Sequence, residues 1–186
     1  MLSAPRGTTR IGVAGRLMTS LLIVSYVLHV IAAAFWTGAV LYGVYALFPA
    51  ASAGTVGREG FVDGVDKLLR VTRYTGVVLP ITGGYQLWVL YPPELLFETT
   101  QGHLVLGMIA LWGLLNGVIE LGVLRTRRLC DDVGVGRYLV EGFPQTALTD
   151  DVSASALLAT ARPYFVAAAG LTVLLLVDAA LLAAGV

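Results

Sequence analysis

The sequence predicts an all-α protein, a polytopic four-helix bundle in a membrane with both termini on the same side. Charged residues make up only 13% of the 186 residues, about half of the roughly 25% usual in soluble domains. Hydrophobic residues make up 57%. Four apolar stretches are long enough to cross a bilayer, which takes about 20 residues of helix. Backbone groups in hydrocarbon must be satisfied within the segment, so these stretches are expected to be helices.

The four predicted spans are marked by their apolar runs and by the residues that follow them. They cover residues 21–48, 68–91, 103–124 and 164–184. Pro49 follows the first span, and Pro92 and Pro93 follow the second, at places where proline cannot disturb a helix. Glycine is frequent within the spans, as expected where helices approach closely in lipid. We therefore expect a single four-helix transmembrane domain over residues 1–186.

The distribution of basic residues predicts the orientation of this bundle. Lysine and arginine in short loops favour the cytoplasmic side. Nine of the 12 basic residues lie in or beside loops 49–67 and 125–161, whereas segment 92–102 has none. The prediction is a multi-pass protein of the cell membrane, with loops 49–67 and 125–161 in the cytoplasm and the termini outside. The nine residues are Arg58, Lys67, Arg70, Arg73, Arg125, Arg127, Arg128, Arg137 and Arg162.

The loop 125–161 is the only long polar segment. Thr149, Asp150 and Asp151 precede the apolar run 155–159 and have the composition of a helix start. We expect an amphipathic interfacial helix here that leads into the fourth span. Cys130 also lies in this loop and is expected to be an ordinary cytoplasmic thiol.

Several function classes are excluded by composition and by the lack of motifs. The formal net charge is zero, so the chain has no electrostatic footprint for nucleic acid. A single cysteine rules out a disulfide within the chain. The sequence contains no phosphate-binding loop and no catalytic motif, and nothing in it resembles a hydrolase or transferase site. An enzyme is therefore not the favoured interpretation.

The polar residues inside the predicted spans gather in one leaflet. Ionisable residues within a membrane are costly and mark candidate functional sites. His103 opens the third span, and His29 lies roughly 12 Å into the first span from the same side, at 1.5 Å per residue. Asp178 lies about 9 Å from the end of the fourth span on that side. Gln86 is in the last third of the second span, which also ends there.

Small residues follow each histidine along its helix. Gly107 comes four positions after His103; Ala33 and Trp36 come four and seven positions after His29. These spacings keep residues on one face of a helix. Stripes of small residues permit close helix packing, which is their commoner use, and they also leave room for a flat cofactor.

Three interpretations of the histidines remain open. In the first, hydrogen bonds satisfy both rings, which then have a structural role. In the second, His29 and His103 bind a metal ion such as copper through neutral imidazole nitrogens. Asp178 or Gln86 would then bind the metal as well or fix the ring orientation. Met108 lies about 140° around its helix from His103, which argues against a sulfur-rich copper site.

In the third interpretation the two histidines are the axial ligands of a b-type haem. This arrangement takes one histidine from each of two helices. Spans one and three run parallel to each other, and each supplies one histidine. Trp36 and Gly107 would then line the cofactor site beside His29 and His103.

A second polar group lies nearer the cytoplasmic side of the third span. Asn116 and Glu120 are four residues apart and share a helix face. Arg125 follows Glu120 by five residues, and Arg70 and Arg73 begin the neighbouring span in the same leaflet. We expect an ion pair between Glu120 and one of these arginines, with a proton relay as the alternative role.

The residues of the first and third spans resemble those of the CopD-like copper-resistance membrane proteins. Segment 28–38 contains His29, Trp36 and Gly38, in the order of that family's histidine, tryptophan and glycine signature. The third span begins with a Gly-His-Leu sequence at His103 and closes on arginines, which looks like the family's glycine-led helix. The resemblance covers all four predicted helices. It implies a copper-handling membrane protein that moves the ion across or along the membrane.

A related pattern occurs in the HemJ-type protoporphyrinogen oxidases, which also begin with a histidine and tryptophan helix. Those proteins carry a lysine early in the third helix and an arginine late in the first, and this chain has neither. The resemblance therefore favours metal or haem binding over porphyrin oxidation. The expected partners are the lipid bilayer and either a second copy of the chain or another membrane subunit. A non-catalytic membrane subunit is a further alternative.

Overall fold

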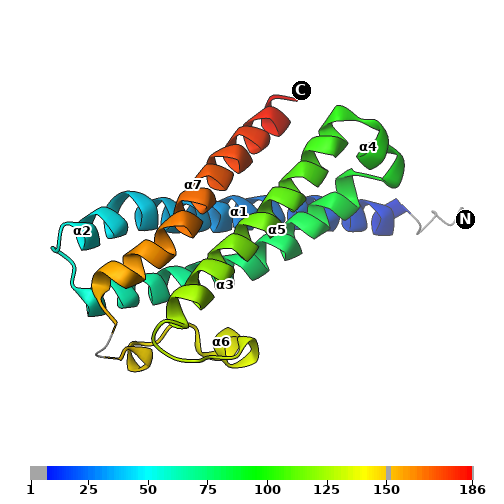
Figure 1. Cartoon of the computed structure of the whole chain (residues 1–186). Coiled ribbons are helices and arrows are strands. Elements are labelled where there is room, and N and C mark those ends of the chain that lie inside the picture. The colour runs from blue at the N-terminus through cyan, green and yellow to red at the C-terminus, as the bar shows by residue number, and fades with distance from the viewer. Residues whose placement is uncertain (1–7, 150–151, 186) are drawn as a thin grey trace, which may run out of the picture.

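The computed structural model describes residues 8–149 and 152–185, and all the regular structure in them is helical. This confirms the predicted all-α class. The four long helices are α1 (Thr8–Tyr42), α3 (Arg58–Leu90), α5 (Thr100–Arg127) and α7 (Ala154–Ala184). Figure 1 shows how they lie relative to one another and to the connection between α5 and α7, which contains α6 (Val135–Glu141).

Three of the helical segments are long and apolar enough to cross a membrane, and they mark the chain as a membrane protein. These segments are Gly15–Ser52, Thr100–Arg127 and Ala154–Ala184. Helix α3 is less apolar, because its first half is charged and its second half contains threonine, glycine and glutamine. Large apolar side chains are exposed along the three segments, among them Phe35, Leu114 and Val173.

The first helix does not stop at Pro49 as expected. It continues through a π-helical turn, Gly43–Leu47, and a short helix α2, Phe48–Ser52. Pro49 lies in the first turn of α2, where the hydrogen-bond register has just been widened by the π turn and proline is tolerated. The second long helix, α3, does end just before Pro92 and Pro93, as predicted.

A short helix, α4 (Pro93–Glu98), connects α3 to α5. Thr99 caps the start of α5, since its side chain accepts a hydrogen bond from the Gly102 backbone nitrogen at 3.0 Å. A Cβ at Gly102 would lie 2.3 Å from the carbonyl oxygens of Leu95 and Leu96. Only glycine lets α4 fold this closely against α5.

The connection from α5 to α7 contains helix α6 (Val135–Glu141) and a 3-10 turn, Gln145–Ala147. The sequence predicted an interfacial helix that starts near Thr149 and leads into the fourth span; the helix instead begins at Ala154 and is continuous with that span as α7. Its cap is Ser153, whose side chain accepts from the Ala156 nitrogen at 3.2 Å. Leu157 and Ala161 of the apolar run are buried with the rest of the inner face of α7. Asp150 and Asp151 lie outside the described residues.

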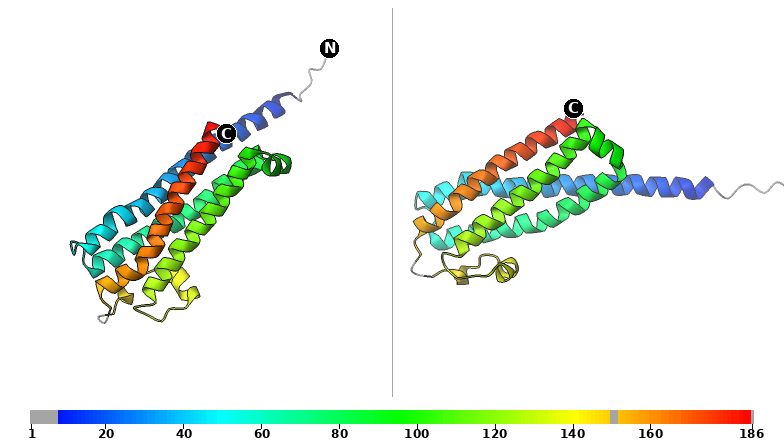
Figure 2. Two further views of the ribbon diagram at one scale, coloured as in Figure 1. Left: turned by 45° about the horizontal axis from the view of Figure 1, so that its top comes forward. Right: turned by 45° about the vertical axis from the view of Figure 1, so that its right-hand side comes forward.

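The long helices pack chiefly as two pairs, α1 with α3 and α5 with α7. Close approach within the second pair depends on Gly122, where a Cβ would lie 2.5 Å from the Tyr164 Cβ. The two pairs meet at the end that carries α6 and diverge toward α4 (Figure 2). The chain is therefore closed at one end and splayed at the other.

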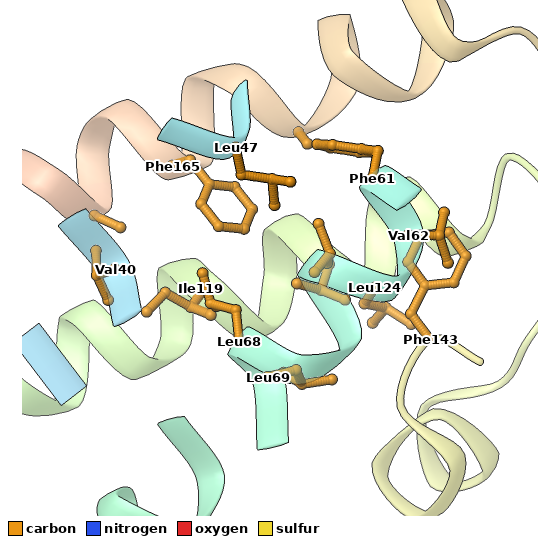
Figure 3. Close-up of a cluster of buried hydrophobic side chains, with 14 of the residues drawn as sticks. Val40, Leu47, Phe61, Val62, Leu68, Leu69, Ile119, Leu124, Phe143 and Phe165 are labelled. Carbon is orange, nitrogen blue, oxygen red and sulfur yellow. The ribbon is translucent and has the colours of Figure 1, made fainter. Parts of the chain in front are cut away.

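The hydrophobic core fills the end where the pairs meet (Figure 3). Phe48 packs edge-on against Phe61 at 5.2 Å between ring centroids and also contacts the ring of Phe165 at 4.9 Å. All four long helices contribute to this core. Its members include Val40, Leu47, Val62, Leu68, Leu69, Leu115, Ile119, Val123, Phe143 and Leu157.

Candidate functional site

The splayed half of the chain contains His29, and its ring is held by Thr82 of α3. The Nδ1 atom of His29 lies 2.8 Å from the Thr82 hydroxyl oxygen. That hydroxyl has a single hydrogen, which it donates to the Val78 carbonyl oxygen at 2.8 Å. With that hydrogen on Val78, the Thr82 oxygen accepts from the Nδ1–H of His29, and we assign this tautomer to the ring. A neutral ring of this tautomer has its lone pair on Nε2, and the Leu79 backbone is a further hydrogen-bond partner of the ring.

Ser25 and Gln86 complete this group, which we call the α1/α3 polar cluster (Ser25, His29, Thr82 and Gln86). Ser25 donates to the Thr82 backbone oxygen at 3.0 Å, and Gln86 donates to the Ser25 hydroxyl at 3.0 Å. A Cβ at Gly83 would lie 3.0 Å from the His29 ring, so glycine makes room for it. The predicted residues His29 and Gln86 are thus brought together.

Ser25 and Thr82 were missed by the sequence reasoning, although a signal for them exists. Ser25 precedes His29 by four positions and Thr82 precedes Gln86 by four. Residues four apart lie on one helix face. Each missed residue therefore shares a face with a residue that was singled out.

Asp178 of α7 lies beside Gly107 of α5, in the other helix pair. A Cβ at Gly107 would lie 3.5 Å from Asp178 Oδ1. Asp178 Oδ2 is buried and has no hydrogen-bond partner within residues 15–149 and 152–185. Two of the predicted site residues therefore meet between α5 and α7.

Two tryptophans add buried donors to the interior of the bundle. Trp36 of α1 is only 1% exposed. Its indole Nε1, like that of Trp112 in α5, has no acceptor in the part of the chain that the structure describes. A buried donor without a partner costs about 1–3 kcal/mol. The interior therefore retains unused capacity to bind a polar group.

His103 has a different environment from His29. Its Nε2 atom lies 2.9 Å from the Phe97 carbonyl oxygen, which only accepts, so Nε2–H is the donor and Nδ1 carries the lone pair. His103 is exposed at the corner between α4 and α5. Its helix, α5, packs on α7 and α3 rather than on α1. In the described part of the chain, no hydrogen bond connects His29 with His103.

The candidate metal-binding residues do not form a preassembled metal site. Among the described residues, no three His, Cys, Asp or Glu side chains lie close enough to hold a metal ion. The groups instead fall into two halves, one on each helix pair. His29 and Gln86 lie on the α1/α3 pair, and His103, Gly107 and Asp178 lie on the α5/α7 pair.

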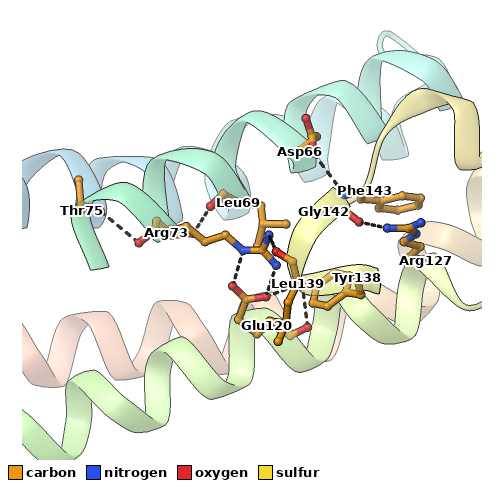
Figure 4. A network of polar contacts seen from close by, with 11 residues as sticks. Asp66, Leu69, Arg73, Thr75, Glu120, Arg127, Tyr138, Leu139, Gly142 and Phe143 are labelled. Atoms are coloured by element: carbon orange, nitrogen blue, oxygen red, sulfur yellow. Dashed lines mark hydrogen bonds and ion pairs between the residues drawn. The ribbon is translucent and has the colours of Figure 1, made fainter. Parts of the chain in front are cut away.

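The predicted ion pair of Glu120 is confirmed, and its partner is Arg73 (Figure 4). Arg73 Nε and Nη2 each lie 2.8 Å from a different carboxylate oxygen of Glu120. This two-bond geometry is the strong form of an arginine–carboxylate pair. Tyr138 of α6 donates to Glu120 at 2.6 Å. Arg70 pairs with Asp66 instead, at 2.7 Å.

Helix α6 is fastened to the bundle by a second ion-pair network. Arg127 is fully buried and donates to the Gly142 carbonyl oxygen and, at 2.6 Å, to Glu141. Asp66 accepts from the Phe143 backbone nitrogen at 3.3 Å. Cys130, in the same connection, is buried, and burial raises the pKa of its thiol. The loop is thus an ordered part of the fold.

Acid is expected to loosen α6. The guanidinium groups of Arg127 and Arg137 hold the pKa of Glu141 below its usual range. A depressed carboxyl pKa contributes stability that is complete above the unfolded-state value, about 4.3, and is lost as the pH falls through the folded-state value. Hydrogen exchange of α6 amides, corrected for intrinsic rates, should stay constant from about pH 5 to 8 and rise below about pH 4. Faster exchange of α6 amides already near pH 6 would contradict this role of Glu141. An unchanged acid response in the Glu141→Gln variant would contradict it as well.

Comparison with known proteins gives neither a family nor a function for the chain. The chain matches no family model, and neither a curated protein nor a solved structure matches it. The resemblance to the CopD-like proteins stays a prediction from the sequence.

Proposed function

We propose that the chain is a multi-pass membrane protein that binds copper within its helices and moves it across the membrane, with His29 as the central ligand. The observation that carries the proposal is the ring geometry of His29. Its Nδ1 lies 2.8 Å from the Thr82 hydroxyl oxygen, and a neutral ring that donates there has its lone pair on Nε2. Neutral imidazole is a common metal ligand, and the hydrogen bond made by its second nitrogen fixes the tautomer that binds.

In this proposal His103, Asp178 and Gln86 support copper binding from the surrounding helices. His103 offers Nδ1, and Asp178 offers a carboxylate oxygen that has no other partner among the described residues. Gln86 steadies His29 through Ser25 and Thr82. Because His29 lies on one helix pair while His103 and Asp178 lie on the other, a shared site would draw the two pairs together.

The closed and splayed ends support access from one side. The core and α6 close the end with the basic loops (Figure 3), whereas the polar groups lie toward the splayed end near α4. We infer that copper enters from the α4 side and that passage to the other side requires the core to loosen. The proposed arrangement is a four-helix transmembrane bundle in which α3 is the remaining span. Its second half, residues 74–90, has no charged residue.

A b-type haem is the second candidate, and the two unpartnered indole N–H groups favour it. Trp36 and Trp112 are donors suited to an anionic propionate. His29 would be one axial ligand and His103 the other, with Gly107 beside the ring. A haem bound here would supply one-electron transfer between the membrane and a partner.

Metal analysis and an oxidised-minus-reduced absorption spectrum of one detergent-purified sample separate these candidates. Copper near one equivalent with a flat visible spectrum is the result we expect. A b-type spectrum that disappears in both His29→Ala and His103→Ala would replace copper with haem. A flat spectrum without metal, after growth in copper, would leave a non-catalytic membrane subunit as the better account.

The proposed orientation makes a labelling prediction of its own. In a Cys130→Ala background, a cysteine at exposed Asp132 should react with a membrane-impermeant maleimide only after the cells are opened. A cysteine at exposed Glu94 in α4 should react in intact cells. Native Cys130 is a poor probe because it is buried. The reverse pattern would place the α6 side outside.

A further inference from the structure

Helix α6 is fixed to the bundle through Tyr138, and three of its apolar side chains are exposed. Tyr138 points inward and is 1% exposed, whereas Val135, Leu139 and Val140 are 52%, 56% and 86% exposed. At about 100° per residue, Val140 lies opposite Tyr138, about 160° around the helix, whereas Leu139 and Val135 lie about 100° and about 60° from it. An exposed apolar face held in a rigid position needs an occupant.

The depth of α6 along the bundle indicates what that occupant is. The Tyr138 hydroxyl lies within 3.2 Å of both the backbone and the side chain of Glu120. Glu120 is seven residues inside the end of α5 at Arg127, roughly 10 Å at 1.5 Å per residue. Figures 1 and 2 likewise place α6 alongside the end of α5 rather than beyond it. A helix at that depth beside a membrane-spanning segment lies at the level of the lipids.

The neighbouring helices α3 and α5 also expose apolar side chains. Tyr74 and Val77 of α3 are 76% and 60% exposed, and Leu121 of α5 is 42% exposed. The two charged residues of α6 neutralise each other, since Arg137 Nε lies 2.9 Å from Glu141. The helix therefore presents apolar side chains and a paired charge rather than a free charge.

We propose that α6 is an interfacial helix whose exposed apolar side chains, Val135, Leu139 and Val140, are embedded in the lipid leaflet on the side of the α5–α7 connection. Its inner face covers the ion pair of Arg73 and Glu120, and its Leu139 backbone oxygen accepts from Arg73 at 3.0 Å. Helix α6 thus separates this intramembrane ion pair from the lipid. The inference depends on membrane insertion of the chain and is independent of copper binding.

Spin-label accessibility in reconstituted vesicles tests the proposal. Single cysteines replace Val140, Leu114 and Asp132 in a Cys130→Ala background, and collisions with oxygen and with a water-soluble nickel chelate are measured. Leu114, 55% exposed at the middle of α5, is the lipid reference, and exposed Asp132 is the water reference. Both references and Val140 lie on the surface, so the labels should not disturb folding.

The Val140 label should have an oxygen-to-chelate ratio about tenfold above that at Asp132, because apolar lipid excludes the polar chelate. A ratio nearer to Asp132 than to Leu114 places α6 in water and overturns the proposal. Low collision rates with both reagents also overturn it, since they indicate that protein covers the face, for example a second copy of the chain. A label at Val135 repeats the measurement if the Val140 variant does not reconstitute.

Discussion

Replacing His29 with alanine is expected to lower the affinity for copper(I) by at least about 100-fold, since it removes the ligand nitrogen itself and not only its orienting group. His29 is the one histidine whose ring is fixed inside the helices, with Nδ1 2.8 Å from Thr82. Alanine has no ring nitrogen that could bind the metal. The measurement is a competition titration against a copper(I) chelator in detergent, with the wild type in parallel.

Two valine substitutions on α3 separate the ligand role of His29 from general packing. Thr82→Val keeps the shape of the side chain but removes the oxygen that accepts from His29, and should weaken copper binding about 10- to 100-fold. Thr75→Val is the matched control, because the Thr75 hydroxyl also donates to a carbonyl four residues earlier, at 2.7 Å, but has no histidine partner. Equal effects of the two variants would show that His29 does not depend on Thr82.

Replacing Phe143 with alanine is expected to cost about 3–5 kcal/mol in free energy of unfolding. Phe143 follows α6 and is fully buried, and Figure 3 shows it beside Val62 and Leu124. A small side chain would leave a cavity at the closed end and release α6 from α3. Denaturant unfolding in detergent measures the stability, and hydrogen exchange over residues 135–147 measures the release.

Phe97→Ala is the matched control for Phe143, because it removes the same atoms from a side chain that is 63% exposed. It should change the free energy of unfolding by less than about 1 kcal/mol. Similar losses for the two variants, or unchanged exchange in α6 of Phe143→Ala, would mean that Phe143 does not anchor the segment.

The helical class and the three apolar helices could be predicted because long apolar runs have few alternatives in lipid. The ion pair of Glu120 could be predicted for a related reason. A carboxylate within a predicted span needs a partner, and Arg70 and Arg73 were the only basic residues of the neighbouring span in that leaflet. The choice of Arg73 over Arg70 depends on side-chain direction, which the sequence does not contain.

The order in loop 125–161 could not be predicted, because it arises from contacts between distant residues. Arg127 counts as an ordinary basic loop residue in the sequence, yet it is fully buried and bonds to Glu141 and Gly142. Phe143 is one aromatic residue in a polar stretch with no periodicity around it. Burial of either residue depends on α3, whose position relative to the loop is a property of the whole fold.

The sequence predicted that the candidate residues lie toward one side of the membrane, but it did not predict how they group. Counting residues along the helices placed His29, His103 and Asp178 in the same leaflet. Depth along a helix does not say which helices are neighbours, and α1 packs on α3 rather than on α5. The sequence therefore paired the two histidines, whereas the structure joins His29 to Thr82 and places Asp178 beside Gly107.

X-ray absorption at the copper edge of the loaded, purified protein tests the proposed role of His29 most directly. Imidazole ligands give a characteristic outer-shell scattering, and nitrogen ligands of this kind lie about 2.0 Å from the metal. We expect this scattering in the wild type and in Thr75→Val, and its reduction in His29→Ala. Imidazole scattering that is undiminished in His29→Ala, or absent from the wild type, would contradict the assignment of His29 as the ligand.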